Sequence, residues 1–200
     1  MLIRLTLCAF LLSSAACAQS LWQTEFEVIG ADLYMQGEIT GRTPRAFAAV
    51  MDANPQITRI VQCEMPGSAD DEAMIALSYD VRARGLATHL EAESEIASGA
   101  VDLFLAGTTR TMERGARLGV HSWSDGERDG IAYPRNSPEH TANAGYVRAM
   151  LGDDGFYWFT LEAAPFDGIH WMSEGEVAAF GLLTEPIRAN DGHPACDRAF

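Results

Sequence analysis

Residues 96–107 read IASGAVDLFLAG and, after a polar connection, residues 116–121 read ARLGVH. The first stretch predicts an apolar helix that begins at Ser98, and the second predicts an apolar strand that ends at His121. A serine at a helix start lies where free backbone N–H groups and the positive end of the helix dipole meet, so an oxyanion beside it is stabilised. A histidine on a neighbouring element can accept the serine proton. Serine is also a preferred N-cap for structural reasons, and taken alone that interpretation of Ser98 is the more common one.

The first residues have the layout of a secretory signal peptide. Arg4 precedes a short apolar run at residues 5–12, and small residues follow up to Ala18. This order, with its A-x-A-like end, predicts a signal peptide at residues 1–18. The apolar run is too short to span a bilayer, and no later stretch is long enough.

The remaining residues, 19–200, have the length of a single domain with a substantial core. We expect this domain to be periplasmic or secreted after cleavage of the signal peptide. A lipoprotein anchored through Cys17 is the alternative. It ranks second because Ser14 stands where such signals usually carry leucine.

The chain is strongly acidic. It contains 28 acidic and 14 basic residues, a net charge of −14. Loss of residues 1–18 removes Arg4 and no acid, which leaves a net charge of −15. Such a surface repels nucleic acid and anionic lipid and offers no basic patch for phosphate, so neither class of partner is expected.

Two cysteines, Cys63 and Cys196, remain after the signal peptide is removed. In an oxidising compartment such a pair usually forms a disulfide. This bridge would tie the carboxyl-terminal tail to the end of a central strand and contribute on the order of 4 kcal/mol by the chain-entropy argument. No histidine or cysteine stands beside Cys63 at ligand spacing, and the histidines share no metal-binding spacing, so no metal site is expected.

Strand-like and helix-like stretches alternate along the chain, which is typical of an α/β architecture. The predicted strands are residues 22–29, 32–37, 57–63, 88–92 and 116–121. The predicted helices are residues 44–54, 70–84, 98–107, 138–151 and 174–180. Residues 124–138 are rich in glycine, proline and charge and predict an exposed loop or lid. An aromatic cluster at residues 156–159 indicates packing, and a short closing strand is expected at residues 182–184.

Five segments resemble, in order, elements of the Clp protease/crotonase superfamily, and in particular a branch of exported bacterial proteins with a Clp-protease-like domain. They are LYMQGEI at residues 33–39, IVQCEMPGS at residues 60–68, ASGAVDLFLAG at residues 97–107, RLGVH at residues 117–121 and WMSEGEVAAFGL at residues 171–182. In the family these are the opening strand, a strand with its glycine loop, the nucleophile helix, the histidine strand and a carboxyl-terminal acidic helix. The resemblance covers most of residues 32–185.

The resemblance implies a spiral of ββα units with Ser98 as nucleophile and His121 as general base. The backbone N–H of Gly99 and the loop Gly67-Ser68 would form the oxyanion hole. The implied substrates are peptides or proteins, bound in part as an added strand beside this loop. No cofactor is implied, and relatives commonly form homo-oligomers.

Two positions depart from the family pattern. Ser68 stands where the family has the second glycine of the loop. A serine there would be strained if that position needs a positive φ. The aspartate that orients the histidine aligns with Ile169. Asp167 lies nearby, and Asp102, one helical turn after Ser98, is a second candidate for this role.

The sequence therefore supports a leading hypothesis and two alternatives. The first is a periplasmic serine hydrolase, peptidase-like, that uses a Ser98–His121 pair. The second is a catalytically inactive scaffold that serves as a binding or assembly module, since the orienting aspartate is missing. A crotonase-type enzyme that acts on acyl-CoA ranks last, because an exported acidic protein would rarely meet CoA and would repel its phosphates.

Overall fold

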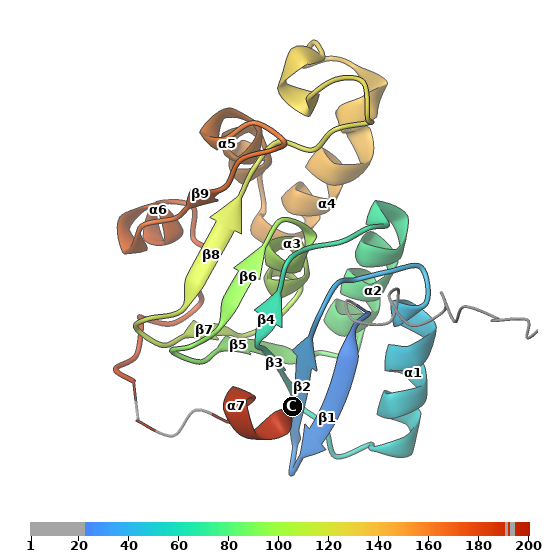
Figure 1. Ribbon diagram of the computed structural model, residues 1–200, viewed down its shortest axis with the longest axis vertical. Coiled ribbons are helices and arrows are strands. Elements are labelled where there is room, and N and C mark those ends of the chain that lie inside the picture. Colours follow the sequence, from blue (N-terminus) through green and yellow to red (C-terminus); the bar gives the residue numbers. More distant parts are fainter. Residues whose placement is uncertain (1–22, 191, 193–194) are drawn as a thin grey trace, which may run out of the picture.

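The structure is a computed structural model that describes residues 23–190, 192 and 195–200 (Figure 1). The predicted signal peptide and its cleavage site lie outside the described residues. Within these ranges no helix has both the length and the apolar character that crossing a bilayer requires.

The strands form two sheets that are mainly parallel. The first sheet has the order β1-β2-β3-β5-β7, with bounds Glu25–Ile29, Asp32–Gln36, Arg59–Gln62, Ala87–Leu90 and Arg110–Met112. The second has the order β4-β6-β8-β9, with bounds Glu64–Met65, Glu95–Ala97, Arg117–Val120 and His170–Trp171. Only the edge strands β1 and β9 pair antiparallel with their neighbours in these described sheets.

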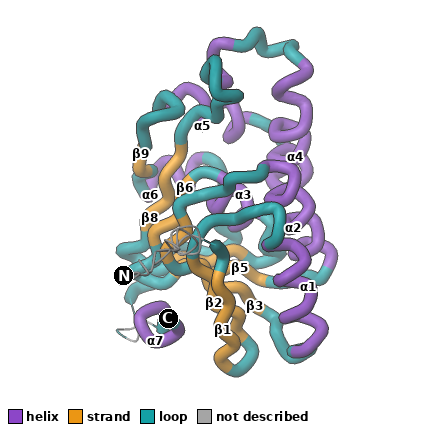
Figure 2. Tube along the Cα trace, turned by 45° about the vertical axis from the view of Figure 1, so that its right-hand side comes forward, coloured by secondary structure: helices purple, strands orange, loops and turns teal. Residues whose placement is uncertain are grey.

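The chain winds between the two sheets as successive strand–strand–helix units. The units are β3-β4-α2, β5-β6-α3 and β7-β8-α4, with the helices at Asp71–Ala83, Gly99–Leu105 and Thr141–Leu151. Helix α1, Thr43–Ala53, precedes them, and α1, α2 and α4 stack along one side of the strands (Figure 2). The fold is therefore the α/β spiral of ββα units that the family resemblance implies.

Helix α3 lies in the middle of the fold, and its burial fixes the position of Ser98 at its start. Every residue of α3 except Asp102 is buried, and Leu103, Phe104 and Leu105 are fully inaccessible. Burial of each such side chain contributes roughly 1.5–3 kcal/mol. This helix cannot shift without losing that contribution, so the residue that precedes it, Ser98, has a fixed position.

The helix ends follow local rules. Asp70 caps α2 by accepting a hydrogen bond from the Ala73 N–H at 2.9 Å, and acids fill the first turn. In α6, Glu174–Ala179, Ser173 and Glu176 form a capping box. The aromatic cluster that the sequence left without an element belongs to α5, Gly155–Ala163.

One predicted strand is absent. Residues 182–184 are irregular because Arg110 takes their hydrogen-bonding groups. Its Nε donates to the Leu182 carbonyl at 2.6 Å, and its backbone N–H donates to Thr184 Oγ1 at 2.8 Å. Together with one backbone hydrogen bond, from the Thr184 N–H to the Arg110 carbonyl at 3.0 Å, these side-chain bonds tie the segment to β7 without forming a strand ladder.

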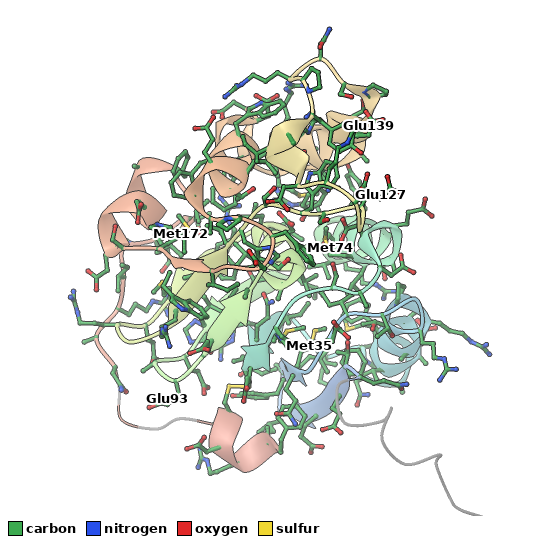
Figure 3. The ribbon with its side chains drawn as sticks, turned by 45° about the horizontal axis from the view of Figure 1, so that its top comes forward. Met35, Met74, Glu93, Glu127, Glu139 and Met172 are labelled. Atoms are coloured by element: carbon green, nitrogen blue, oxygen red, sulfur yellow. A yellow bond between two sulfur atoms is a disulfide. The ribbon has the colours of Figure 1, made fainter. Side chains whose placement is uncertain are left out.

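Cys63 and Cys196 form the expected disulfide, with Cα atoms 5.6 Å apart (Figure 3). Cys63 follows β3, the middle strand of the first sheet, and Cys196 begins α7, Cys196–Ala199. The buried Glu91 carboxylate accepts from the backbone N–H groups of Ala195 and Cys196 at 2.8 and 3.0 Å. The tail is thus held by a covalent bond and a charge-assisted cap.

Candidate active site

The backbone of Ser98 is strained. Its φ is +53° and its ψ is −131°, and among the described residues no other non-glycine residue has a positive φ. Such a conformation costs on the order of 1–3 kcal/mol and persists only where the surroundings enforce it. Ser98 stands at the N-cap position of α3, yet its side chain makes no capping hydrogen bond. The strained backbone therefore leaves the Ser98 hydroxyl free of the helix end instead of using it as a cap.

Two glycines allow the loop after β4 to lie directly against Ser98 and α3. A Cβ added to Gly67 would lie 2.9 Å from Ser98 Cβ, and one added to Gly99 would lie 2.3 Å from Ser68 Oγ. Any side chain at either glycine would collide with the opposing serine. Gly67 also has a φ of +141°, whereas Ser68 does not need a positive φ. The serine at this family glycine position is therefore accommodated without backbone strain.

Two backbone N–H groups beside Ser98, those of Ser68 and Gly99, are available to a ligand. The Ile39 N–H donates to the Gly67 carbonyl at 2.9 Å, and the Ala69 N–H donates to the Ile39 carbonyl at 2.8 Å. This parallel bridge turns the N–H of Ser68 to the opposite side. In the described part of the chain, neither the Ser68 N–H nor the Gly99 N–H donates to a protein acceptor. The arrangement suits an oxyanion.

His121 follows the last residue of β8. Its Nδ1 lies 2.8 Å from the Ser122 carbonyl oxygen, and its ring lies 6.3 Å from the exposed ring of Phe166. When Nδ1 carries the proton and donates to this carbonyl, Nε2 is left as an acceptor. No described residue hydrogen-bonds to Nε2.

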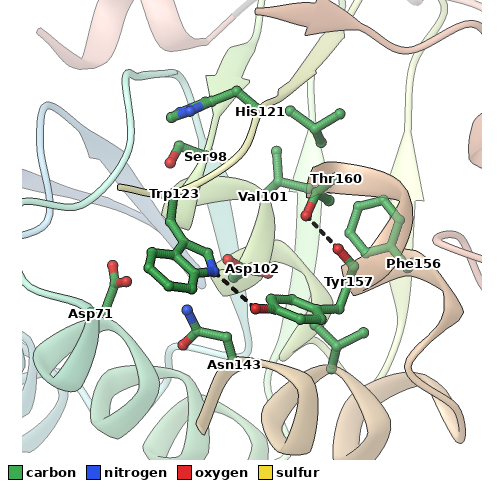
Figure 4. A pocket seen from close by; sticks show the side chains of 12 residues that line it. Asp71, Ser98, Val101, Asp102, His121, Trp123, Asn143, Phe156, Tyr157 and Thr160 are labelled. Atoms are coloured by element: carbon green, nitrogen blue, oxygen red, sulfur yellow. Dashed lines mark hydrogen bonds between the residues drawn. The ribbon is translucent and has the colours of Figure 1, made fainter. Parts of the chain in front are cut away.

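Ser98 and His121 line the same cavity (Figure 4). Their side chains do not hydrogen-bond to each other in the described structure. Two separate elements, the start of α3 and the end of β8, thus bring the two groups to one place without joining them.

No carboxylate contacts His121 among the described residues. Asp167 lies in the exposed turn between α5 and β9 and makes no side-chain hydrogen bond or ion pair. Asp102 lines the cavity but does not bond to the imidazole. The β8–β9 ladder ends at the Val120–His170 pair, because the next N–H, that of Ser122, donates to the Ala164 carbonyl at 2.9 Å. Ile169, at the position that aligns with the orienting aspartate, packs its side chain against Gly119 instead.

The cavity that begins at Ser98 has a volume of about 60 Å³, counted as space open to the centre of a water molecule. Its wall combines aromatic and apolar side chains with polar groups from four helices and two loops. The lining residues are Asp71, Ser98, Val101, Asp102, Val120, His121, Trp123, Asn143, Val147, Phe156, Tyr157 and Thr160.

Two carboxyl groups share this cavity. Burial raises the pKa of Asp102 to about 7, and the charge of Asp71 adds to this shift. Asp71 is held at the cavity wall by Ser68, whose Oγ donates to it at 2.9 Å. Because each unit of raised pKa reflects about 1.4 kcal/mol against the charged form, ionised Asp102 is a costly group in this place.

The aromatic wall is fixed by hydrogen bonds. Trp123 Nε1 donates to Tyr157 Oη at 2.8 Å, and the same Oη lies 2.6 Å from Nδ1 of the buried His140. Burial raises the pKa of Tyr157 to about 12, so it stays a neutral phenol. This network anchors the start of the 124–138 loop to α5.

Sequence reasoning did not single out several of these residues. Trp123 and Tyr157 lie in stretches that predict only packing, and Asp71 lies in an acidic run that is ordinary for a helix start. The role of the Ser122 carbonyl is invisible in sequence because it belongs to the backbone. Asp102 carried the one useful signal, an acid inside an otherwise apolar helix.

Comparison with known proteins gives no match to a family model and none to a curated protein. Solved structures do match. DspI of Pseudomonas aeruginosa has a TM-score of 0.56 at 12% identity, covering 92% of this chain and 80% of that chain. A membrane-bound stomatin-specific protease, a mutant in complex with a substrate peptide, has a TM-score of 0.55 at 15% identity, with 79% and 74% covered.

An enoyl-CoA hydratase/carnithine racemase from Magnetospirillum magneticum has a TM-score of 0.54 at 16% identity, covering 88% of this chain and 70% of that chain. At such identities the likeness concerns the fold and not the activity. A protease and an enoyl-CoA hydratase are thus both similar in fold to this chain. The chain has the fold of the Clp protease/crotonase superfamily.

Proposed function

We propose that this chain is an exported serine hydrolase that cleaves peptide bonds, with Ser98 as nucleophile and His121 as general base. The observation that carries the proposal is the positive φ of Ser98 at the start of a buried helix, where no capping bond accounts for it. Strain of this kind gathers at functional sites, where it fixes a reactive group.

The chemistry follows from the groups around Ser98. Ser98 Oγ attacks the substrate carbonyl carbon and gives its proton to His121 Nε2, which then protonates the leaving amine. The N–H groups of Ser68 and Gly99 bind the oxyanion, and water hydrolyses the acyl-enzyme in a second round. His121 must come within hydrogen-bond reach of Ser98 for this step, and such contacts are often long before substrate binds.

In this proposal a backbone carbonyl replaces the carboxylate behind the histidine. The Ser122 carbonyl selects the tautomer that leaves Nε2 free, but a neutral acceptor stabilises imidazolium less than a carboxylate does. We expect a slow enzyme. Substrate would lie extended beside the free side of Ser68, where one more strand can be added.

The test is labelling of the purified chain with a fluorophosphonate probe, followed by mass spectrometry of the modified peptide. We expect one adduct, on Ser98, that is lost in Ser98→Ala and strongly slowed in His121→Ala. Ser137→Ala, a serine outside the cavity, is the matched control and should label like the wild type. A folded wild-type protein that takes up no probe would refute the proposal.

The alternative is an inactive scaffold that binds a partner, and the apolar Ile169 at the position of the orienting aspartate favours it. The same experiment separates the two functions, because a scaffold leaves Ser98 unlabelled. Export is tested independently by fractionating cells and sequencing the mature N-terminus, which we expect at Gln19. The disulfide supports an oxidising compartment.

A further inference from the structure

The cavity beside Ser98 extends along the first turn of α3 to the carboxyl group of Asp102. Asp102 is largely buried, and it makes no side-chain hydrogen bond or ion pair with any described residue. Asp71 faces the same cavity from α2. No arginine lines this cavity, and the chain contains no lysine. Two acids thus line one cavity, and the described lining residues include neither arginine nor lysine.

The walls of the cavity suit a cation. Trp123 and Tyr157 line it with aromatic rings, and their mutual hydrogen bond keeps them in place (Figure 4). A guanidinium or ammonium group gains from aromatic faces and from a carboxylate at the same time. The acidic surface of the chain also attracts a cationic ligand from a distance.

The size and placement suit one long side chain. Ser98 immediately precedes α3, and Asp102 lies in its first turn, where the Asp102 N–H donates to the Ser98 carbonyl at 3.4 Å. Both residues line the same cavity. A cavity of about 60 Å³ holds a handful of water molecules, which is room for a single side chain and not for a cofactor.

We propose that this cavity is the specificity pocket for the residue whose carbonyl Ser98 attacks, and that it selects arginine or lysine through Asp102 and Asp71. The assignment rests on the proposed function, since Ser98 defines which substrate residue enters. The cationic side chain runs along α3 from Ser98, lies against Trp123 and ends at Asp102. Its charge relieves the cost of ionising that carboxyl group.

The test uses two peptide diphenyl phosphonates that differ only in the residue next to phosphorus, arginine in one and leucine in the other. With the wild-type chain we expect the arginine probe to modify Ser98 at least tenfold faster. Asp102→Leu should abolish or reverse this preference. Asp102→Asn, which keeps the shape, should lose most of it, and thermal unfolding shows whether each variant is folded.

Failure of this inference is distinct from failure of the proposed function. If a plain fluorophosphonate labels Ser98 but the leucine probe reacts as fast as the arginine probe or faster, the pocket assignment is overturned and the hydrolase stands. If no probe labels Ser98, the hydrolase proposal is refuted. A binding experiment then tests by itself whether the cavity binds a cation.

That experiment is calorimetric titration of benzamidine into Ser98→Ala and into the double variant Ser98→Ala/Asp102→Asn. Both proteins lack the nucleophile, so only binding is measured. We expect affinity to fall at least tenfold when Asp102 is also replaced. Equal affinity in the two proteins, or no binding to either, would overturn the cation pocket.

Discussion

Gly67 lies so close to Ser98 that a single methyl group between them does not fit. A Cβ on Gly67 would approach Ser98 Cβ to 2.9 Å and Ser98 Oγ to 3.4 Å. The φ of +141° at Gly67 independently disfavours any other residue. The loop and the helix start therefore form one unit, and the geometry of the proposed oxyanion hole depends on a missing side chain.

Gly67→Ala should remove activity more than it removes stability. The new methyl pushes the loop away from Ser98, and the Ser68 N–H moves with it. Loss of one oxyanion donor typically costs 10²–10³-fold in rate. Labelling rate and urea unfolding measured on the same sample check this. The matched variant is Gly145→Ala in α4, where a Cβ has open space and should leave labelling unchanged.

Ser98→Gly should be more stable than Ser98→Ala. Both variants lack the hydroxyl, but glycine adopts a φ of +53° without strain, whereas alanine keeps the strain of serine. We expect the glycine variant to exceed the alanine variant by about 1 kcal/mol in free energy of unfolding. Chemical denaturation of the two proteins measures the difference. Equal stability would mean that Ser98 is not strained and would remove the main support for its role.

The sequence predicts the α/β architecture because its long elements carry strong local signals, whereas the spiral of ββα units is implied only by the family resemblance. Helix α2 has a capping Asp70, acids in its first turn and Arg82 in its last, so its bounds agree with the prediction within one residue. The strands β4, β6, β7 and β9 have only two or three residues each, which is too short for any periodicity. They form because the spiral places neighbours beside them.

The site could be predicted only in part. Ser98, His121 and Gly67 are recognisable because a family pattern fixes their spacing, and the structure places Ser98 and His121 on one cavity. The hydrogen-bond partner of His121 Nδ1 could not be predicted, because it is the backbone carbonyl of Ser122. The pocket walls come from α2, α4 and α5, and no local pattern reports which helix faces meet.

Asp102→Asn should stabilise the chain above pH 7 and leave it unchanged near pH 4. The pKa of Asp102 is raised from 3.8 to about 7, so the folded chain holds this proton more tightly than the unfolded chain does. Stability contributed by the proton is therefore lost as pH rises from 4 to 7. The other titratable groups that line the cavity with Asp102 are Asp71, His121 and Tyr157, and Tyr146 donates to the Asp102 backbone carbonyl at 2.6 Å; no arginine is among the described lining residues.

The expected gain from Asp102→Asn at pH 8 is on the order of a few kcal/mol. Thermal unfolding at pH 4, 5.5, 7 and 8 measures the difference between variant and wild type. Asp167→Asn, at an exposed turn, is the control and should show no such trend. A difference that does not change with pH would contradict a protonated Asp102.

Replacement of both Cys63 and Cys196 by serine should destabilise the chain without changing the site. The disulfide closes a loop with a sequence separation of 133 residues, worth on the order of 4 kcal/mol in the chain-entropy argument. The bridge joins β3 to α7, neither of which lines the cavity. We expect a lower midpoint in urea and an unchanged labelling rate of the folded protein. A clearly lower labelling rate in the folded variant would show that the carboxyl-terminal tail also affects the geometry of the site.

Ile169→Asp should accelerate Ser98. Residue 169 adjoins His170, the ladder partner of Val120, at the end of β8 that leads to His121, and Ile169 is 43% exposed, so the change from isoleucine to a carboxylate costs little burial. Nδ1 of His121 then exchanges a neutral carbonyl for a charged acceptor, which stabilises imidazolium in the transition state. We expect at least a tenfold faster fluorophosphonate reaction, dependent on His121. Ile169→Asn is the matched variant, since it can accept a hydrogen bond but carries no charge, and it should give a much smaller gain. An aspartate at position 169 that leaves the rate unchanged in a folded protein would mean that His121 does not act on Ser98.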